Sequence, residues 1–593
     1  AQAEPTHLTR FNDRRAVFIT VTQKDGQDVA KITAGVDKVL DDYQKTLPAG
    51  VKLERGFVQA RNVELRLNRL FRDFGIALAL VLITLLPLGP RAGLVVMVSI
   101  PLSLLIGLSM LQALGFTLNQ LSIAGFVLAL GLLVDDSIVI TENIARRIRE
   151  GEERTAAAIN GARQIALAVV GCTACLMLAF LPLMALPAGS GAYIRSLPVT
   201  VLCTVGASFV VSMTIIPFLA SRVLDKHSDP EGNALLRAVN GAIHRFYRPV
   251  LHFGLARPWL SLAIMLALCL TTLPMLKIIG SSLFPAAETP QFIVRVETPD
   301  GSPLARTDRA LRFVEARLKA EPDITWRAAN LGRGNPQIFY NVSQRESSTT
   351  YGEVFASLKA WEPGKSEAVL DDLRRDFARF PGARISVVTF ENGPPIDAPI
   401  AVRLTGQNLE VLKALAARAE AVLKAAPGTR DVSNPVRLDR TDLDLGVDEG
   451  KAAALGVPAG APRRVARLAL SGEETGRFRD PDGDDYAVKV RLPMAATDGS
   501  AQTGDRNALA DLSKIYVPTA DGEAAPLGAI ATPTLRSSPA RIDRFDRERT
   551  VTVSSYVQTG YLTAKVTADI VARLDRDLPM PPGYRLTLGG QAE

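Results

Sequence analysis

The stretch GLLVDDSIVITEN, from Gly131 to Asn143, places two adjacent carboxylates, Asp135 and Asp136, inside one of the most hydrophobic parts of the chain. An ionised aspartate at the middle of a membrane costs at least about 2.5–3.5 kcal/mol on insertion scales. Two neighbouring negative charges also repel each other, so at least one of the two should take up a proton near neutral pH. Intramembrane acids generally carry function, and this pair is a plausible proton carrier.

A structural role is the alternative for this pair. Asp135 and Asp136 would then accept hydrogen bonds from Ser or Thr hydroxyls on neighbouring helices. Glu142 and Asn143 follow at the end of the apolar run, beside Arg146. For these two residues we expect an interfacial polar cluster rather than a role in transport.

The chain joins two kinds of sequence. Of its 593 residues 22% are charged, yet the mean hydropathy is positive, at +0.15. Long uncharged runs alternate with short basic ones between Phe74 and Leu276, whereas both flanks have the composition of soluble protein. The sequence therefore predicts a membrane region between soluble domains.

Six transmembrane helices are predicted, because a crossing needs about 20 mainly apolar residues. The run from Ala92 to Val134 is too long for one crossing and is best divided at ALGFTLNQ, from Ala113 to Gln120. The predicted spans are 74–90, 92–114, 119–141, 164–187, 196–221 and 258–276. An even number returns the chain to the side on which it began.

Basic residues set the orientation, because lysine and arginine in short loops remain in the cytoplasm. They follow the first, third and fifth predicted helices, whereas the loop 113–120 has no charge. Both soluble flanks should therefore lie outside the cytoplasm. Segment 232–256 is too polar to span but has apolar residues at helical spacing. It predicts an amphipathic helix on the cytoplasmic membrane surface, or else a plain surface helix of a cytoplasmic loop.

The soluble region alternates strand-like and helix-like segments, which indicates α+β sandwiches of ferredoxin type. One subdomain is expected at 281–398 and a second at 399–438 with 536–593. In residues 439–535 the alternation of strands and helices weakens, and we interpret this segment as an insertion. Residues 12–53 resemble residues 545–586, so 1–60 is expected to be the second half of a related subdomain. We expect the chain to be an internal piece of a duplicated protein, a design common in transporters.

Three motifs carry a resemblance to a known family. They are GLLVDDSIVITENIARRI (131–148), AINGARQI (158–165) and SGAYIRSLPVTV (190–201). They resemble the resistance-nodulation-division (RND) efflux pumps, in the branch that exports hydrophobic and amphiphilic compounds. The likeness covers nearly the whole chain. It implies an α-helical membrane bundle with α+β ferredoxin-like periplasmic porter subdomains, and a docking subdomain at 439–535.

The resemblance also implies a function. Such pumps export hydrophobic or amphiphilic compounds by drug/proton antiport, as the inner-membrane part of a tripartite assembly in Gram-negative bacteria. The implied partners are a periplasmic adaptor (membrane fusion) protein, an outer-membrane channel and two further copies in a homotrimer. Protons are the coupling ion, with no cofactor, metal, nucleic acid or enzymatic reaction. In the family the matching acidic pair relays protons, so Asp135 and Asp136 are the expected relay, and its lysine partner should lie outside this chain.

Three other classes of function are open but less favoured. A heavy-metal RND pump would be expected to carry methionines outside the membrane, where the chain has only Met494 and Met580. An RND-related accessory to protein or lipid translocation would not be expected to have duplicated porter domains. A sterol-sensing relative would have disulfides in its soluble domain, but all four cysteines (Cys172, Cys175, Cys203 and Cys269) fall in predicted spans. Cys172 and Cys175 form a C-x-x-C, which we interpret as packing residues.

The loop LGRGNPQIFYNV, from Leu331 to Val342, lies where the family has a flexible loop along the substrate path. Phe339 and Tyr340 are the candidate aromatic contacts to an amphiphile. The alternative is an ordinary strand with core aromatic residues.

Overall fold

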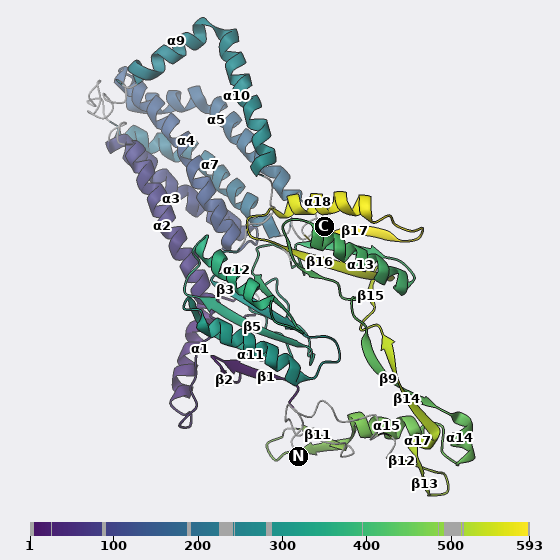
Figure 1. The fold of residues 1–593 in the computed structure, drawn as a ribbon. Helices are drawn as coiled ribbons and strands as arrows, with labels where there is room; N and C mark the ends of the chain where they lie inside the picture. Colours follow the sequence, from purple (N-terminus) through teal and green to yellow (C-terminus); the bar gives the residue numbers. More distant parts are fainter. Residues whose placement is uncertain are drawn as a thin grey trace. The chain divides into compact units, whose positions relative to one another are not determined.

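The computed structural model describes residues 5–24, 27–85, 90–186, 191, 193–224, 241, 243–279, 287–393, 395–483, 485–490, 512 and 515–590. The chain divides into two compact units (Figure 1). One unit is helical and comprises 21–280 with 392–395, and the other contains the sheets and comprises 1–20, 281–391 and 396–593.

The helical unit consists mainly of long helices. Its elements are α1 (Val29–Gln44), α2 (Gln59–Leu85), α3 (Pro90–Ala113), α4 (Gln120–Arg149), α5 (Arg154–Met184), α7 (Ser196–Val223), the π-helix η2 (Ile243–Tyr247), α9 (Arg248–Ala256) and α10 (Pro258–Ile279). Helix α4 begins at a capping box, in which Asn119 accepts from the backbone N–H groups of Leu121 and Ser122. This cap satisfies two N–H groups that have no partner within the helix.

Among the described residues four helices, not the predicted six, are long and apolar enough to cross a membrane. They are α3, α4, α5 and α7. The predicted span 74–90 falls in the second half of α2, whose first half is charged, and residues 86–89 lie outside the described residues. The predicted span 258–276 falls in α10. The helical segment 243–256 and residues 258–274 are long and apolar enough only when taken together, and the two are bent by 108° relative to each other. If this bent pair is one crossing, the number of candidate membrane spans among the described residues is five.

The helix ends also differ from the predicted spans. Helix α4 continues to Arg149, beyond the predicted end at 141, and α5 begins at Arg154, before the predicted start at 164. A membrane helix does not stop where its apolar run stops, because its backbone hydrogen bonds can continue into the polar region. Gly151, with φ of 99°, makes the tight connection between the two helices.

The predicted amphipathic segment 232–256 is described only in part. Residues 243–256 are helical, in η2 and α9, whereas 225–240 and 242 lie outside the described residues. Its position on a membrane surface stays a prediction.

Helix α7 forms the centre of the helical unit, where it packs against α3, α4 and α5. Glycines allow the close approach that tight helix packing in membranes needs. A Cβ added at Gly107 of α3 would lie 2.9 Å from Thr204 Oγ1, and one at Gly125 of α4 would lie 2.9 Å from the Leu197 carbonyl oxygen. Buried apolar side chains at both ends of α7 complete the packing.

The first sheet has six antiparallel strands in the order β2-β1-β4-β5-β3-β6. They are β1 (Leu8–Phe11), β2 (Arg14–Arg15), β3 (Gln291–Glu297), β4 (Ile324–Leu331), β5 (Tyr351–Leu358) and β6 (Arg384–Thr389). Helices α11 (Leu304–Ala320) and α12 (Lys365–Phe377) contribute Leu311 and Leu373 to a core shared with Val294 and Val354 of the sheet.

Strand β1 pairs with β4 of this sheet and is also held by a buried ion pair to α11. The Arg10 guanidinium lies 2.7 Å from Glu315 and 2.6 Å from Asp308, both on α11. Residues 8–15 therefore pair with the sheet of the 281–391 segment, whereas α1 belongs to the helical unit. The subdomain boundaries drawn from the sequence stay a prediction.

The second sheet has its own helices and its own core. Its strands are β7 (Ile400–Thr405), β8 (Thr429–Ser433), β15 (Asp543–Phe545), β16 (Glu548–Val557) and β17 (Arg585–Gly590). Their order is β15-β16-β7-β17, with β8 also paired to β16. Helices α13 (Leu409–Ala425) and α18 (Thr563–Asp577) supply Leu415 and Ile570 to a core with Val402 and Val553.

A two-stranded antiparallel ribbon extends from the second sheet toward a small separate core (Figure 1). The ribbon pairs β9 (Arg440–Val447) with β14 (Ala531–Ser538). Between them lie α14 (Glu449–Ala454), α15 (Ala461–Ser471), β10 (Glu473–Arg479), β11 (Asp485–Val490), β12 (Tyr516–Pro518), β13 (Ala524–Pro526) and α17 (Leu527–Ile530). The ribbon starts and ends close to the limits of the insertion expected at 439–535, whose docking role is a prediction.

Candidate functional site

Asp135 and Asp136 lie on the apolar part of α4, and their surroundings differ. Successive residues of an α-helix point about 100° apart, so the two carboxylates face different directions. The Asp135 side chain is exposed, whereas Asp136 is half-buried. Asp136 Oδ2 accepts a hydrogen bond from Thr173 Oγ1 of α5, at 3.3 Å.

A second hydrogen bond fixes the backbone beside the pair. Ser208 of α7 donates its hydroxyl to the Leu133 carbonyl of α4 at 3.0 Å. Leu133 lies two residues before Asp135, so α7 holds α4 at the carboxylates. Other buried hydroxyls of α7 instead donate within their own helix, for example from Thr204 to the Thr200 carbonyl at 2.6 Å.

The bond from Thr173 fits the structural alternative as well as a relay. Asp135 differs, because within the described part of the chain it makes no hydrogen bond or ion pair, and its exposed carboxylate has no opposite charge beside it. The basic residues of the four long helices are arginines, and none of them pairs with it: Arg91, Arg146, Arg147, Arg149, Arg154, Arg163 and Arg222.

A polar cluster joins the basic end of α4 to α5. Asn143 donates its amide to the Gly161 carbonyl at 2.8 Å, and Arg147 donates to Gln164 Oε1 at 2.8 Å. Arg147 also pairs with Glu152 at 2.9 Å. A polar cluster is therefore present around Asn143, and it holds α4 and α5 together beyond Asp136. Among the described residues Glu142 takes no part in it, and its position at a membrane interface stays a prediction.

The cysteines of the long helices show no metal or redox arrangement. Cys172 and Cys175 are free thiols on the exposed side of α5, and Cys203 is a buried free thiol of α7. The residues that the structure describes contain no group of three or more His, Cys, Asp or Glu side chains placed to hold a metal ion.

Phe339 and Tyr340 have different environments. Phe339 is buried, with 8% of its surface exposed, and its ring stacks on Phe390 at 4.6 Å between centroids. Tyr340 is 51% exposed, with its ring 4.9 Å from that of Phe339. The burial of Phe339 agrees with the alternative of a core aromatic residue. Substrate contact remains a prediction for both, and for Phe339 it requires that the loop move.

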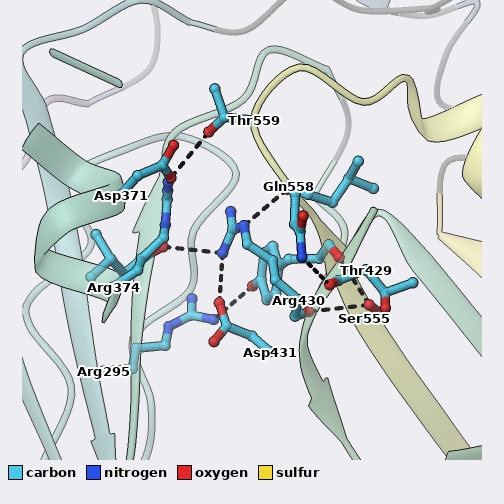
Figure 2. Close-up of polar contacts among 12 residues, drawn as sticks. Arg295, Asp371, Arg374, Thr429, Arg430, Asp431, Ser555, Gln558 and Thr559 are labelled. Carbon is cyan, nitrogen blue, oxygen red and sulfur yellow. Dashed lines mark hydrogen bonds and ion pairs between the residues drawn. The ribbon is translucent and has the colours of Figure 1, made fainter. Parts of the chain in front are cut away.

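Sequence reasoning did not find a polar contact between the two α+β subdomains (Figure 2). Arg430 on β8 donates through Nε to the Val557 carbonyl at 2.9 Å, and it pairs with Asp431 at 2.6 Å. It also donates to the Val387 carbonyl on β6 of the other sheet, at 3.4 Å. Its guanidinium lies 5.1 Å from the Tyr556 ring centroid. Arg430 thus links the two sheets.

Further polar contacts surround Arg430 (Figure 2). Thr559 donates to Asp371 Oδ1 of α12 at 3.1 Å, and the same carboxylate pairs with Arg374 at 2.6 Å. Burial, together with the nearby positive charge of Arg430, lowers the pKa of Arg374. Arg295 donates to the Tyr556 hydroxyl at 3.3 Å. Two separate apolar cores joined by polar groups are typical of subdomains that can move against each other.

The fold and the acidic helix together define the class of the protein. Long apolar helices, one with a carboxylate pair, combined with α+β subdomains and a ribbon-borne insertion, indicate an RND-type permease. Residues 1–593 match the model of the AcrB/AcrD/AcrF family, and the chain belongs to that family.

Similar curated proteins are multidrug resistance proteins MdtC. The chain is 24% identical to that of Serratia proteamaculans (strain 568) over 595 residues, which cover 98% of this chain and 55% of the relative. Identity and coverage are the same for Salmonella agona (strain SL483). For Enterobacter sp. (strain 638) identity is 23% over 593 residues. The chain spans about half the length of the curated relatives it matches.

Proposed function

We propose that the chain is part of a proton-driven exporter of hydrophobic or amphiphilic compounds, with Asp135 and Asp136 as its proton relay. Membership of the AcrB/AcrD/AcrF family supports a transporter rather than an enzyme. The name of the MdtC relatives supports drugs as the exported compounds.

The observation that carries the proposal is the asymmetric placement of the carboxylate pair on α4. Asp136 has a hydroxyl donor, Thr173, whereas Asp135 is exposed and has no partner among the described residues. A hydroxyl that donates to a carboxylate favours its ionised form. Asp135 has no such donor among the described residues, so the two neighbouring carboxylates have different surroundings. The arrangement is therefore suited to bind and release a proton.

A proton on this pair would change the forces on α4. One charge that crosses the membrane potential releases about 2.3 kcal/mol per 100 mV. An ionised Asp136 keeps the bond from Thr173, and a protonated one can become a donor itself. The Ser208 bond ties α4 to α7 at the same level, so a shift of α4 would also move α7. Protonation would thus select between two helix arrangements.

The wider assembly belongs to the same proposal. The helical unit would lie in the inner membrane of a Gram-negative bacterium, with the α+β subdomains in the periplasm. A homotrimer would act with a periplasmic adaptor and an outer-membrane channel. The positive partner of Asp135 and Asp136 would be a lysine outside this chain, and protons rather than a cofactor would be the coupling species.

Resistance measurements on the full-length protein test the proposal. Asp135→Asn and Asp136→Asn should each abolish drug resistance in a host without competing pumps, while expression and trimer formation stay intact. Glu142→Gln is the matched control, because Glu142 is an exposed carboxylate on the same helix, and it should retain resistance. Unchanged resistance with both aspartates substituted would overturn the relay.

A further inference from the structure

The helical segment 243–256, formed by η2 and α9, is open on all sides within the described part of the chain. Neither helix contains a buried residue. Its apolar side chains are as open as its polar ones: Phe246 is 70% exposed, Val250 67% and Leu255 74%. Contiguous apolar surface of this kind marks an interaction site, so the segment requires a partner that covers it.

The exposed residues of this segment divide into two faces. Residues three or four positions apart lie on the same side of a helix. One face is apolar and comprises Ile243, Phe246, Val250 and Phe253. Arg245 and Arg248 lie on another face, at the same spacing. The segment is therefore amphipathic, and its polar face is basic.

A fixed elbow joins the segment to α10. Pro258 begins α10, and a residue before proline avoids the helical conformation. Arg257 accordingly has φ of −134° and ψ of 66°. The Ser261 hydroxyl of α10 donates to the Gly254 carbonyl of α9 at 3.3 Å, across the bend. The chain turns there by 108° (Figure 1), and Arg257 stands at the corner.

The elbow carries positive charge without a counter-ion. Its charged residues are Arg245, Arg248 and Arg257, and the sequence has no Asp or Glu between positions 231 and 288. Among the described residues none of the three guanidinium groups forms an ion pair. A cluster of one sign of charge attracts ligands of the opposite sign, so the expected partner is anionic as well as apolar.

The bend places this segment across the direction of α10. Residues 258–274 of α10 are uncharged, as a membrane crossing requires. A helix nearly perpendicular to a crossing lies along the membrane surface, with its apolar face among the lipid chains and its basic face at the headgroups. Trp259, 82% exposed at the start of α10, fits this level, because tryptophan gathers at membrane interfaces. Arginines in short connections mark the cytoplasmic side.

We propose that the basic elbow, residues 243–259, binds anionic phospholipids of the cytoplasmic leaflet. Its three arginines hold the phosphates, because a guanidinium group can donate two parallel hydrogen bonds to one phosphate. Phe246 and Val250 lie among the acyl chains. Headgroups held at the corner fix the depth at which α10 enters the membrane. This contact is independent of the proton relay on α4.

Other occupants match only one face of the elbow. An apolar protein helix would cover the apolar face but would leave the three arginines without a counter-ion. A free phosphate ion would pair with the arginines but would leave Phe246 and Val250 in water. An anionic phospholipid supplies a negative headgroup beside an apolar chain, so it matches both faces at once.

The test is photocrosslinking of the full-length protein in vesicles of equal parts phosphatidylethanolamine and phosphatidylglycerol. Benzoylphenylalanine takes the place of Val250 in every sample, and mass spectrometry identifies the lipids that it captures. The variants are Arg248→Gln and the triple variant Arg245→Gln/Arg248→Gln/Arg257→Gln. The matched control is Arg149→Gln, which removes an exposed arginine at the end of α4. A parallel series contains inorganic phosphate.

We expect phosphatidylglycerol to be captured about fivefold more than phosphatidylethanolamine, with or without the Arg149→Gln substitution, as for one arginine at an anionic surface. Arg248→Gln should lower this preference, and the triple variant should capture both lipids equally. Total lipid capture should stay constant, because the apolar face is unchanged. A fivefold preference that persists in the triple variant would overturn the proposal. Crosslinks to protein in place of lipid, or a preference abolished by inorganic phosphate, would overturn it as well.

Discussion

Thr173 on α5 donates its hydroxyl to Asp136 on α4 at 3.3 Å, while the adjacent Asp135 side chain is exposed. Two acids that are neighbours in sequence therefore have different surroundings in the fold. One is held by a neighbouring helix, and the other makes no hydrogen bond within the described residues. The proposed proton relay depends on this difference.

Thr173→Val should weaken the relay without abolishing it. The substitution keeps the side-chain volume but removes the donor to Asp136, so the ionised carboxylate loses about 1 kcal/mol of support. We expect transport to fall about fivefold, because Asp136 loses the hydroxyl that holds its carboxylate in place. The measurement is the rate of drug export at equal protein expression.

Thr214→Val is the control for this experiment. Thr214 is an exposed residue of α7 that bonds to the Val210 carbonyl of its own helix. A loss of transport equal to that of Thr173→Val would show that any lost helix hydroxyl has this effect.

Gly125→Ala should destabilise the helical unit. A Cβ at Gly125 would lie 2.9 Å from both the Leu197 carbonyl oxygen and Thr200 Cβ, which are closer than real Cβ contacts. Such overpacking costs about 1–3 kcal/mol. Gly131, also in α4, has no heavy atom within 4 Å of an added Cβ. Gly131→Ala should be neutral or stabilising by up to about 1 kcal/mol. Thermal unfolding of the purified protein compares the two, and equal melting temperatures would contradict the packing.

Arg430→Ala should loosen the contact between the two α+β subdomains. It removes the bond to Val387 on β6 and the bond to Val557 on β16, and leaves Asp431 without its ion-pair partner. We expect hydrogen exchange to rise at both strands, and the stability to fall by about 1–3 kcal/mol.

Arg576→Ala is the matched control, because the exposed Arg576 pairs with its neighbour Asp577 and, within the described residues, with no group of the other sheet. This substitution should leave hydrogen exchange unchanged. If exchange at β6 stayed at the wild-type rate in Arg430→Ala, Arg430 would not link the sheets.

Glu420 on α13 should make the second subdomain acid-sensitive. Burial opposes its ionisation, but Lys424 at 2.6 Å and Asn434 at 3.0 Å outweigh this and lower its pKa. Because the pKa of Glu420 is lower in the folded state, the contact stabilises the protein at pH values above about 4.3, the ordinary pKa of glutamate. This stability, about 2 kcal/mol, is lost as the pH falls further. In Glu420→Gln the free energy of unfolding should therefore decrease less steeply as the pH is lowered below about 4.3.

Glu410→Gln is the comparison for that measurement. Glu410 lies on the same helix but its side chain is 78% exposed and pairs with Lys413 at 3.1 Å. An exposed pair contributes little, so this variant should keep the wild-type acid limb. Identical curves for the two variants would rule out the buried contact as the cause.

Hydropathy predicts the helices that are apolar along most of their length. Helices α3, α4, α5 and α7 pass the same length and composition test in the structure. Hydropathy is less informative for α2, because charges occupy its first half, and for α10, which passes the test only with the bent segment before it. Both cases depend on where a helix begins and bends, which an apolar run does not specify.

The partners of the functional residues could not be predicted in the same way. The pair Asp135 and Asp136 is visible in sequence because two acids interrupt an apolar run. Thr173 is one of several hydroxyls in the apolar helices, and only packing of α5 against α4 selects it. Arg430 lies in a strand without any motif, and its contact with Val387 depends on how two separate cores meet. Such pairings join residues far apart in the chain.

Proton flux through the reconstituted full-length protein is the most direct test of the relay. With an imposed pH gradient and a fluorescent pH indicator in the vesicles, addition of drug should trigger proton movement in the wild type. The same addition should give none in Asp136→Asn at equal protein incorporation. Drug-triggered proton movement at the wild-type rate in Asp135→Asn/Asp136→Asn would contradict the account.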